Sequence, residues 1–303
     1  MNARSAAARL SAPVSAPVSA PVEPQAPAGG ALLARRVRSL RRRRFLVLGL
    51  QVLVAVVWLG SWQLTTQLGL VDKFFFAQPS EIAQKLWVWI TEGTELGPLW
   101  DQVLTTMEET FGGFVVGSLL GIVLGVALGR IRLLSDVLSP YIKGANAIPR
   151  VVVGALFAIS LGLDIKSKIA TAAILVFFVV FFNAFQGVRE VDRNLIANAR
   201  ILGAGNRQLT TEIIVPSALS WILASLHTSF GLALVGAVVG ELFGATSGVG
   251  ELIYSAKNNF DANGVFAGMA LLAAIALVAE ALITALENRL VRWRPQVSTE
   301  ARI

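Results

Sequence analysis

Residues 194–221, NLIANARILGAGNRQLTTEIIVPSALSW, form a polar, glycine-containing segment between two long apolar runs. Leu195, Ala199 and Leu202 lie at positions i, i+4 and i+7, so a helix carries them on one face. Gly203 follows directly, and glycine suits the left-handed turn that commonly ends a helix. The segment therefore predicts a short helix with an apolar ridge that ends at Gly203.

The flanking residues predict a helical hairpin. Asp192 precedes the first helix and is a suitable N-cap. A second short helix is expected over NRQLTTEII, and Pro216, which lacks a backbone donor, is expected to start the next apolar span. Such a projection is too small to form its own core. Its ridge fits either the groove of a partner protein or the headgroup region of a membrane.

The chain as a whole has the composition of a membrane protein. Of its 303 residues, 55% are hydrophobic and 15% are charged, and the mean hydropathy is +0.67, far from the balance of a soluble domain. Cysteine is absent and histidine occurs once, which excludes disulfide frameworks, Cys/His metal sites and a cysteine nucleophile. The net charge of +7 comes from basic residues beside apolar runs, which favours a role in membrane orientation over nucleic-acid binding.

Six apolar segments are long enough to cross a bilayer, which takes about 20 residues of helix. We expect an all-α integral membrane protein with spans at residues 45–70, 104–129, 137–162, 168–188, 217–244 and 264–288. The third segment is the weakest, because prolines and basic residues interrupt it. These are Pro140, Lys143, Pro149 and Arg150. An even number of spans places both termini on the same side of the membrane.

Basic residues near the span ends indicate which side is cytoplasmic. Arginines gather near the first span, after the second span, in the polar segment and after the last span. They are Arg35, Arg36, Arg38, Arg41, Arg42, Arg43, Arg44, Arg130, Arg132, Arg189, Arg193, Arg200, Arg207, Arg289, Arg292 and Arg294. The other side carries Lys73, Lys85, Lys166, Lys168 and Lys257. We therefore expect the N-terminus, the C-terminus and the polar segment to be cytoplasmic.

Three regions are expected along the chain. Residues 1–44 predict a disordered cytoplasmic tail that ends in an arginine cluster, because the SAPV repeat from Ser11 to Val22 cannot bury a core. Residues 45–292 predict the transmembrane domain, with the projecting loop at about 190–216. Residues 293–303 predict a C-terminal tail.

Glycines form stripes on two of the spans. In the second span glycine recurs every fourth residue from Gly113 to Gly129, which lets another helix approach closely. The fifth span repeats the spacing at Gly236, Gly240 and Gly244. Packing within the chain is the expected use, and a subunit interface or a gate is the alternative.

The polar segment resembles the cytoplasmic loop of the permease subunits of bacterial ATP-binding-cassette (ABC) importers. That loop reads glutamate-alanine-alanine, three residues, glycine, nine residues, isoleucine, any residue, leucine, proline. The matching positions here hold Ala197, Asn198, Ala199, Gly203, Ile213, Val215 and Pro216. The spacing agrees throughout, while Ala197, Asn198 and Val215 depart in residue type. The glutamate of the family loop is replaced by Ala197, while the spacing that sets the docking shape is kept.

The resemblance covers about residues 73–292 and is closest to the nitrate/sulfonate/taurine branch, through PSEIAQKLW, AIPR, NLIANARILGA and GAVVGELFGATSGVGELI. It implies a type I ABC importer permease fold and a homodimer in the lipid of the bacterial inner membrane. It also implies a cytoplasmic ATPase subunit that receives the loop, and a periplasmic or lipid-anchored substrate-binding protein that delivers a small anion such as sulfonate, taurine or nitrate. The expected docking residues are Leu195, Ala197, Asn198, Ala199, Leu202, Gly203, Ile213 and Pro216.

The chain has no G-x-x-x-x-G-K-[ST] loop to hold nucleotide phosphates. ATP and magnesium are therefore expected on the partner ATPase, and this chain is expected to hold no cofactor, no metal and no catalytic residue. It is not expected to be an enzyme. The alternative function is a self-contained proton-coupled secondary transporter, for which inverted repeats and mid-membrane acids are typical, but no clear internal repeat is present.

Ionisable residues inside spans are candidate pathway positions. Arg150 lies near the middle of the third span beside Pro149, which interrupts the helix. A guanidinium suits the oxygens of a sulfonate, nitrate or carboxylate, so Arg150 is a candidate cargo contact. Neutralisation by Glu108, Glu109 or another acid between helices is the alternative role.

Glu241 precedes FGATSGVGELIY, which is expected to form a short outer helix that gates the path. A structural cap is the other role open to Glu241. His227 is expected to be a packed, hydrogen-bonded residue, and no role is assigned to Glu280.

Overall fold

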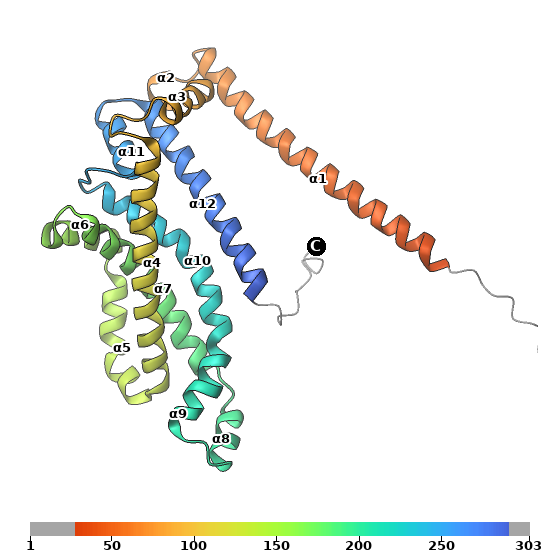
Figure 1. Ribbon diagram of the computed structural model, residues 1–303, viewed down its shortest axis with the longest axis vertical. Helices are drawn as coiled ribbons and strands as arrows, with labels where there is room; N and C mark the ends of the chain where they lie inside the picture. The colour runs from red at the N-terminus through yellow and green to blue at the C-terminus, as the bar shows by residue number, and fades with distance from the viewer. Residues whose placement is uncertain (1–27, 291–303) are drawn as a thin grey trace, which may run out of the picture. The chain divides into compact units, whose positions relative to one another are not determined.

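The computed structural model describes the backbone of residues 28–290 and the side chains of Arg43, residues 45–131 and residues 133–285. Every named element in this part of the chain is a helix (Figure 1). In chain order they are α1 (Ala28–Gln67), α2 (Lys73–Phe76), α3 (Pro79–Thr91), α4 (Leu99–Arg130), α5 (Arg132–Ala147), α6 (Arg150–Leu161), α7 (Ile165–Arg189), α8 (Arg193–Ile201), α9 (Asn206–Gln208), the π-helix η1 (Leu209–Ile214), α10 (Val215–Glu241), α11 (Val249–Asn258) and α12 (Ala262–Leu290).

The described residues divide into two units, with the boundary between Trp58 and Leu59. The first unit holds most of α1, whose described side chains are exposed up to the boundary. The part of α1 from Phe45 to Gln67 is long and apolar enough to span a membrane. Lipid is therefore the medium that suits these side chains. The helix begins at Ala28, so residues 28–44, expected to belong to a disordered tail, are helical. Residues 1–27 and 291–303 lie outside the described part.

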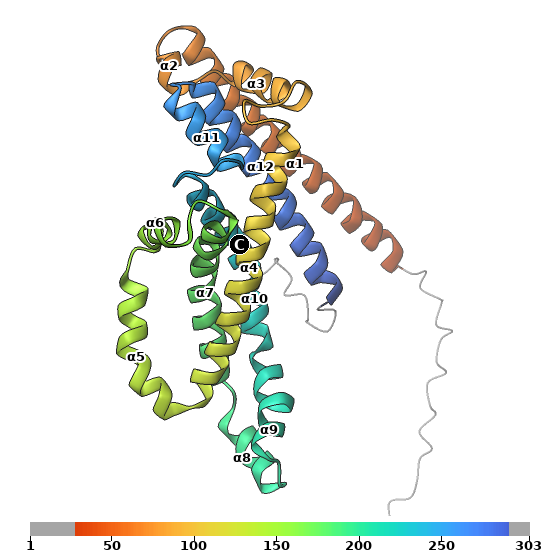
Figure 2. The same cartoon turned by 60° about the vertical axis from the view of Figure 1, so that its left-hand side comes forward.

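Three long helices form the centre of the second unit. Helices α4 and α10 both pack along α7, and these are the most extensive helix contacts among the described residues (Figure 2). The α4 glycines from Gly113 to Gly129 lie directly against the α7 backbone: a Cβ at Gly117 meets the Ala173 carbonyl and the Val176 side chain. Gly236 of α10 faces the Ala172 backbone in the same way. The glycine stripes therefore serve packing within the chain, as expected.

Gly244 does not belong to the second stripe. Helix α10 ends at Glu241, and Gly244 lies in the following turn with φ +110°. A left-handed backbone conformation, which glycine adopts without strain, explains its presence there.

The third expected span is broken. Helices α5 and α6 meet at an angle of 86° across residues 148 and 149, whereas five other helical stretches of the described chain are each a candidate span by themselves. Pro149 is the N-cap of α6, and the residue before a proline is driven out of the helical region. Figure 2 shows α6 turned across the direction of α5. The interruption expected at Pro149 is therefore confirmed, and the segment expected as the third span consists of two helices. The described residues hold five candidate spans, or six if this bent pair is one span.

The fifth span begins earlier than expected. Helical residues continue from Asn206 through η1 into α10, so that Asn206–Glu241 is a single candidate span. Pro216 lies inside this helical stretch, directly after the π-helix. The wider π turn accommodates a residue that has no backbone donor. The helix expected over NRQLTTEII is thus present as α9 and η1, and Pro216 lies in the first turn of α10 as expected. The difference is that no break separates this helix from the span.

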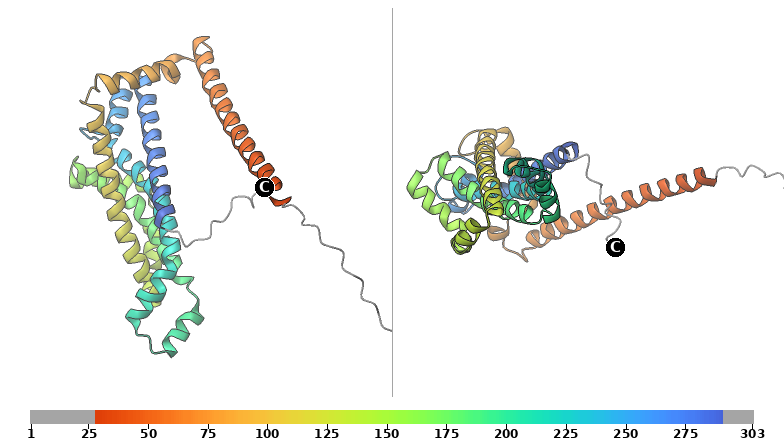
Figure 3. Two further views of the ribbon diagram at one scale, coloured as in Figure 1. Left: turned by 45° about the vertical axis from the view of Figure 1, so that its right-hand side comes forward. Right: turned by 90° about the horizontal axis from the view of Figure 1, so that it is seen from below.

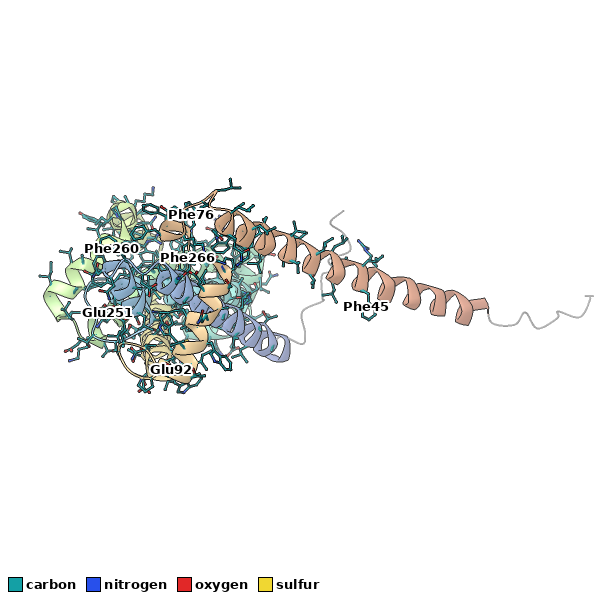
Figure 4. The ribbon with its side chains drawn as sticks, turned by 90° about the horizontal axis from the view of Figure 1, so that it is seen from above. Phe45, Phe76, Glu92, Glu251, Phe260 and Phe266 are labelled. Carbon is teal, nitrogen blue, oxygen red and sulfur yellow. The ribbon has the colours of Figure 1, made fainter. Side chains whose placement is uncertain are left out.

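Helices α2, α3 and α11 lie at one end of this unit, and α8 and α9 lie at the other (Figure 3). A small core of Ala77, Ile82, Trp89, Leu252 and Ala267 joins α3, α11 and α12 at the first end. Phe266 packs edge-on against Trp62, with ring centroids 5.5 Å apart, and Figure 4 looks down on this end with Phe266 labelled.

A salt bridge also joins α3 to the start of α12. Lys85 Nζ lies 2.8 Å from Asp261 Oδ2. Burial alone raises the pKa of Asp261, but hydrogen bonds from Lys85 and from the Gly264 amide outweigh it, and the pKa of this carboxyl lies below its ordinary value. The end that carries α11 is therefore held by polar contacts as well as by an apolar core.

Candidate functional site

The projecting loop has the hairpin form that its sequence predicts. Asp192 caps α8, accepting a hydrogen bond of 2.8 Å from the Asn194 amide. Gly203 ends the helix with φ +88°, and its amide donates to the Arg200 carbonyl. Both local assignments from sequence are confirmed, because capping and left-handed turns depend on neighbouring residues alone.

The projection is fixed at its base. Ile196 packs against an apolar cluster that contains Val188 and Ile214, and Leu209 is 2% exposed. From α4, Arg130 Nη2 donates to the Asn206 carbonyl at 2.9 Å. The α8–η1 region is thus tied to the ends of both α4 and α7.

Part of the outer surface of the projection is an exposed apolar ridge. Leu202 is 87% exposed and Leu195 is 48% exposed, while Ala199 is half-buried. Ile201 is 83% exposed and was missed by the i, i+4, i+7 pattern, since it lies one position before Leu202. The ridge is therefore broader than the sequence pattern indicates.

Three of the expected docking residues meet around one hollow. Leu202, Gly203 and Ile213 line it together with Ala204, Gln208 and Glu212, and its volume is about 210 Å³. Ala197, Asn198 and Pro216 are exposed but lie outside this hollow. The arrangement is a projection with an apolar rim and a shallow recess, which suits contact with a complementary protein surface.

At the other end, Glu241 lies in a buried polar cluster. Its side chain is fully buried, and it accepts hydrogen bonds from Thr106 Oγ1 at 2.6 Å and from the Gly250 amide at 2.5 Å. The segment after Glu241 does form a short helix, α11, as expected, and Glu241 contacts its first turn. Gln102 and Thr106, which the sequence reasoning missed, come from a helix more than a hundred residues earlier.

Two further charged groups border this cluster. Lys168 of α7 is 5% exposed, and its ammonium donates to the Leu163 carbonyl. Glu251 lies on α11 near Lys168: burial raises the pKa of the Glu251 carboxyl, and the nearby lysine opposes that shift. The described residues contain no group of three or more His, Cys, Asp or Glu side chains arranged to hold a metal ion.

Arg150 lies at the first residue of α6, directly after the break. Its Nη2 donates to Asn146 Oδ1 at 2.5 Å, and its guanidinium carbon lies 5.0 Å from the Phe178 ring centroid. Among the described side chains Arg150 forms no salt bridge. Neutralisation by Glu109 is wrong, because Glu109 is buried beside Glu241.

His227 has a polar contact between two helices. Its Nε2 lies 2.7 Å from Glu280 Oε1, which joins α10 to α12. The expectation of a hydrogen-bonded histidine is thus confirmed. Glu280, to which no role was assigned, is the partner.

These features define an all-α transmembrane protein with a helical projection at one end. A family model described as "Binding-protein-dependent transport system inner membrane component" matches residues 117–292, and the chain belongs to that family. It is a permease component of an ABC importer and a multi-pass inner-membrane protein, and permease subunits of this kind are not enzymes.

Individual relatives agree with this assignment. The riboflavin transport system permease protein RibX of Chloroflexus aurantiacus is 34% identical over 85% of this chain and 94% of its own length. The putative aliphatic sulfonates transport permease protein SsuC of Bacillus subtilis is 32% identical over 89% of this chain and 98% of its own length. The taurine transport system permease protein TauC of Escherichia coli is 29% identical, with 85% and 93% covered.

A solved structure agrees on the fold. The MetNI methionine ABC transporter in an inward-facing conformation matches with a TM-score of 0.50 and 20% identity, over 64% of this chain and 93% of the matched chain. At that identity the likeness shows the fold alone.

Proposed function

We propose that two copies of this chain form a substrate pathway and that each copy couples to a separate ATPase through the projection at about residues 190–216. The projection carries this proposal, because it is firmly based and presents an exposed apolar ridge beside a recess. An ATPase cleft that holds the ridge transmits nucleotide-dependent movement to α8 and, through η1, to α10. ATP and magnesium belong to the ATPase, and a substrate-binding protein supplies the cargo at the opposite end.

The proposed cargo is a small organic or inorganic anion such as a sulfonate, taurine or nitrate. Two of the compared relatives are named for sulfonates and taurine. Arg150 supports an anion, because its guanidinium sits at a helix break and forms no salt bridge among the described residues. Since another relative is named for riboflavin, tests of cargo should include a neutral compound.

Co-purification tests the coupling. The tagged chain is extracted in mild detergent and the proteins that accompany it are identified. We expect an ATPase with a phosphate-binding loop to accompany the wild type and to be lost from Gly203→Trp, because a bulky side chain at φ +88° disturbs the ridge. Gly69→Trp is the matched control, since Gly69 also has a positive φ and open space around it but lies far along the chain from the projection.

Two outcomes contradict the proposal. One is an ATPase that stays bound to Gly203→Trp with undiminished transport. The other is a wild-type chain that purifies without any ATPase in several mild detergents and still carries out proton-driven uptake, which favours the self-contained secondary transporter.

A further inference from the structure

The first turn of α11 is capped by side chains from two other helices. The Gly248 amide donates to Gln102 Oε1 at 2.8 Å, the Val249 amide to Thr106 Oγ1 at 2.9 Å and the Gly250 amide to Glu241 Oε2 at 2.5 Å. Helix N-termini leave backbone N–H groups without partners inside the helix. Here α4 and α10 supply those partners, so the start of α11 is bound to both helices.

Glu241 is the centre of this contact. Thr106 bridges it to α11, because its hydroxyl donates to Glu241 Oε1 at 2.6 Å and accepts from the Val249 amide. A Cβ at Gly248 or at Gly250 falls on the Glu241 carboxyl group. The α11 backbone therefore lies in direct contact with the carboxylate, and only glycine permits that approach.

A second buried carboxyl group lies beside the first. Glu109 is 1% exposed and within hydrogen-bonding reach of Glu241, and its Oε2 has no hydrogen-bond partner. Ionised carboxylates only accept hydrogen bonds, so contact between two of them requires a proton on one. The other charged groups that face the pair or border it are Lys168 of α7, Glu108 of α4 and Glu251 of α11.

We propose that Glu109 and Glu241 share one proton and form a latch that holds the first turn of α11 against α4 and α10. Glu241 is a positioning residue: it binds the α11 backbone and does not need to touch cargo. Release of the latch lets α11 move away and opens the pathway at the end opposite to the docking projection. This last step rests on the proposed function.

The absence of cysteine from the chain allows a direct test. Val249 is fully buried in the latched turn, and Val249→Cys is a conservative reporter there. Every protein in this test carries Val249→Cys, and below the wild type means Val249→Cys with no further change. In membrane vesicles we measure how fast N-ethylmaleimide modifies this single thiol. Adding Glu241→Gln should raise the rate about tenfold or more, because a charge-assisted hydrogen bond to the helix N-terminus is lost.

Two carboxyl-to-amide changes on α4 are matched controls. Glu108→Gln removes an exposed charge one residue away and should leave the rate unchanged. Glu109→Gln should also leave it nearly unchanged, because the amide donates to Glu241 as the shared proton does. Thr106→Val, which removes the bridging hydroxyl with little change of shape, should raise the rate and provides a second variant if Glu241→Gln does not fold.

The pH profile separates a shared proton from a purely structural role. Raising the pH removes the proton from the wild-type pair, and the two carboxylates then repel each other. Labelling of the wild type should therefore rise relative to labelling of Glu109→Gln, in which that proton is replaced by an amide. The ratio of the two rates cancels the ionisation of the reporter thiol itself.

Equal labelling of the wild type, Glu241→Gln and Thr106→Val overturns the latch, and a ratio that does not change with pH overturns the shared proton. For the gate, ATP and vanadate are added to the complex with bound ATPase, and the wild-type rate should rise. An unchanged rate despite trapped nucleotide overturns the gating step. If the proposed function is wrong but the latch is right, no ATPase binds to the chain, while the labelling rates of the variants still differ.

Discussion

At the scale of single residues, Arg150 is the strongest candidate for a cargo contact. The guanidinium is half-buried at the start of α6, where it is held by Asn146 and packed against Phe178. Neither neighbour neutralises its charge, so an anion that reaches it gains a charge-assisted, planar pair of hydrogen bonds. Because Pro149 ends the preceding helix, the backbone near Arg150 is also less regular than in a continuous span.

Replacing Arg150 by glutamine should raise the KM for an anionic cargo about tenfold or more, because a hydrogen bond to a charged group is lost. The KM of Arg150→Lys should lie between that of the wild type and that of Arg150→Gln, since lysine keeps the charge but not the planar guanidinium group. Lys143→Gln removes an equal charge from an exposed site on α5 and should leave KM unchanged. Uptake of a sulfonate and of riboflavin in reconstituted vesicles measures the effect. Wild-type KM for the sulfonate in Arg150→Gln rules out the contact.

At the scale of elements, α7 organises the bundle because two glycine surfaces pack on it. A methyl group at Gly117 overlaps the Ala173 carbonyl, and one at Gly236 overlaps the Ala172 backbone. Backbone atoms cannot move aside as the end of a flexible side chain can. The close approach of these helices therefore depends on the absence of a side chain at these positions.

Gly117→Ala and Gly236→Ala should each destabilise the protein by about 1–3 kcal/mol, the usual effect of overpacking a tight contact. Gly231→Ala is the matched control on α10, because no neighbouring atom lies within 4 Å of the position that its Cβ would take. This control should be neutral or slightly stabilising, as alanine favours a helix by up to about 1 kcal/mol. Thermal unfolding in detergent measures the difference. Equal stability of all three variants contradicts close packing on α7.

The elements that sequence predicts well are those with local causes. The cap at Asp192, the turn at Gly203 and the four-residue glycine spacing from Gly113 each depend on neighbouring residues, and each was foreseen. For the third span, Pro149 in the sequence predicts an interruption but not its geometry. The angle of 86° between α5 and α6 depends on packing against α7. The π turn before Pro216 likewise follows from how a continuous helix accommodates proline.

The contacts that form the latch could not be predicted from the sequence. Glu241 was singled out because a charge inside a span is costly, and the short helix after it was expected. Its partners Thr106 and Glu109 lie on α4, and Thr106 is 135 positions from Glu241 in the sequence. In one sequence nothing links such distant positions, and Glu109 was considered only as one of the acids that could neutralise Arg150. Only the packing of α4 and α10 on α7 brings the two carboxyl groups together.

At the scale of the whole molecule, one helical stretch joins the two proposed working parts. Residues Asn206–Glu241 run from the docking projection to the latch residue without interruption. A helix of this length moves largely as a rigid element, so displacement at η1 also displaces Glu241. Among the described basic residues, Arg193, Arg200 and Arg207 lie in the α8–α9 region, and Lys73, Lys85 and Lys257 lie on α2, α3 and α11.

The distribution of basic residues also predicts the sidedness of the protein. By the excess of arginine, the α8–α9 end should face the cytoplasm and the turn between α11 and α12 the outside. Leu202→Cys and Asn258→Cys place single thiols at exposed sites at the two ends. On intact spheroplasts a membrane-impermeant maleimide should modify Asn258→Cys and spare Leu202→Cys, which should react only after the membranes are opened and the ATPase is stripped. The opposite pattern places the projection outside, where no cytoplasmic ATPase reaches it, and contradicts the proposed coupling.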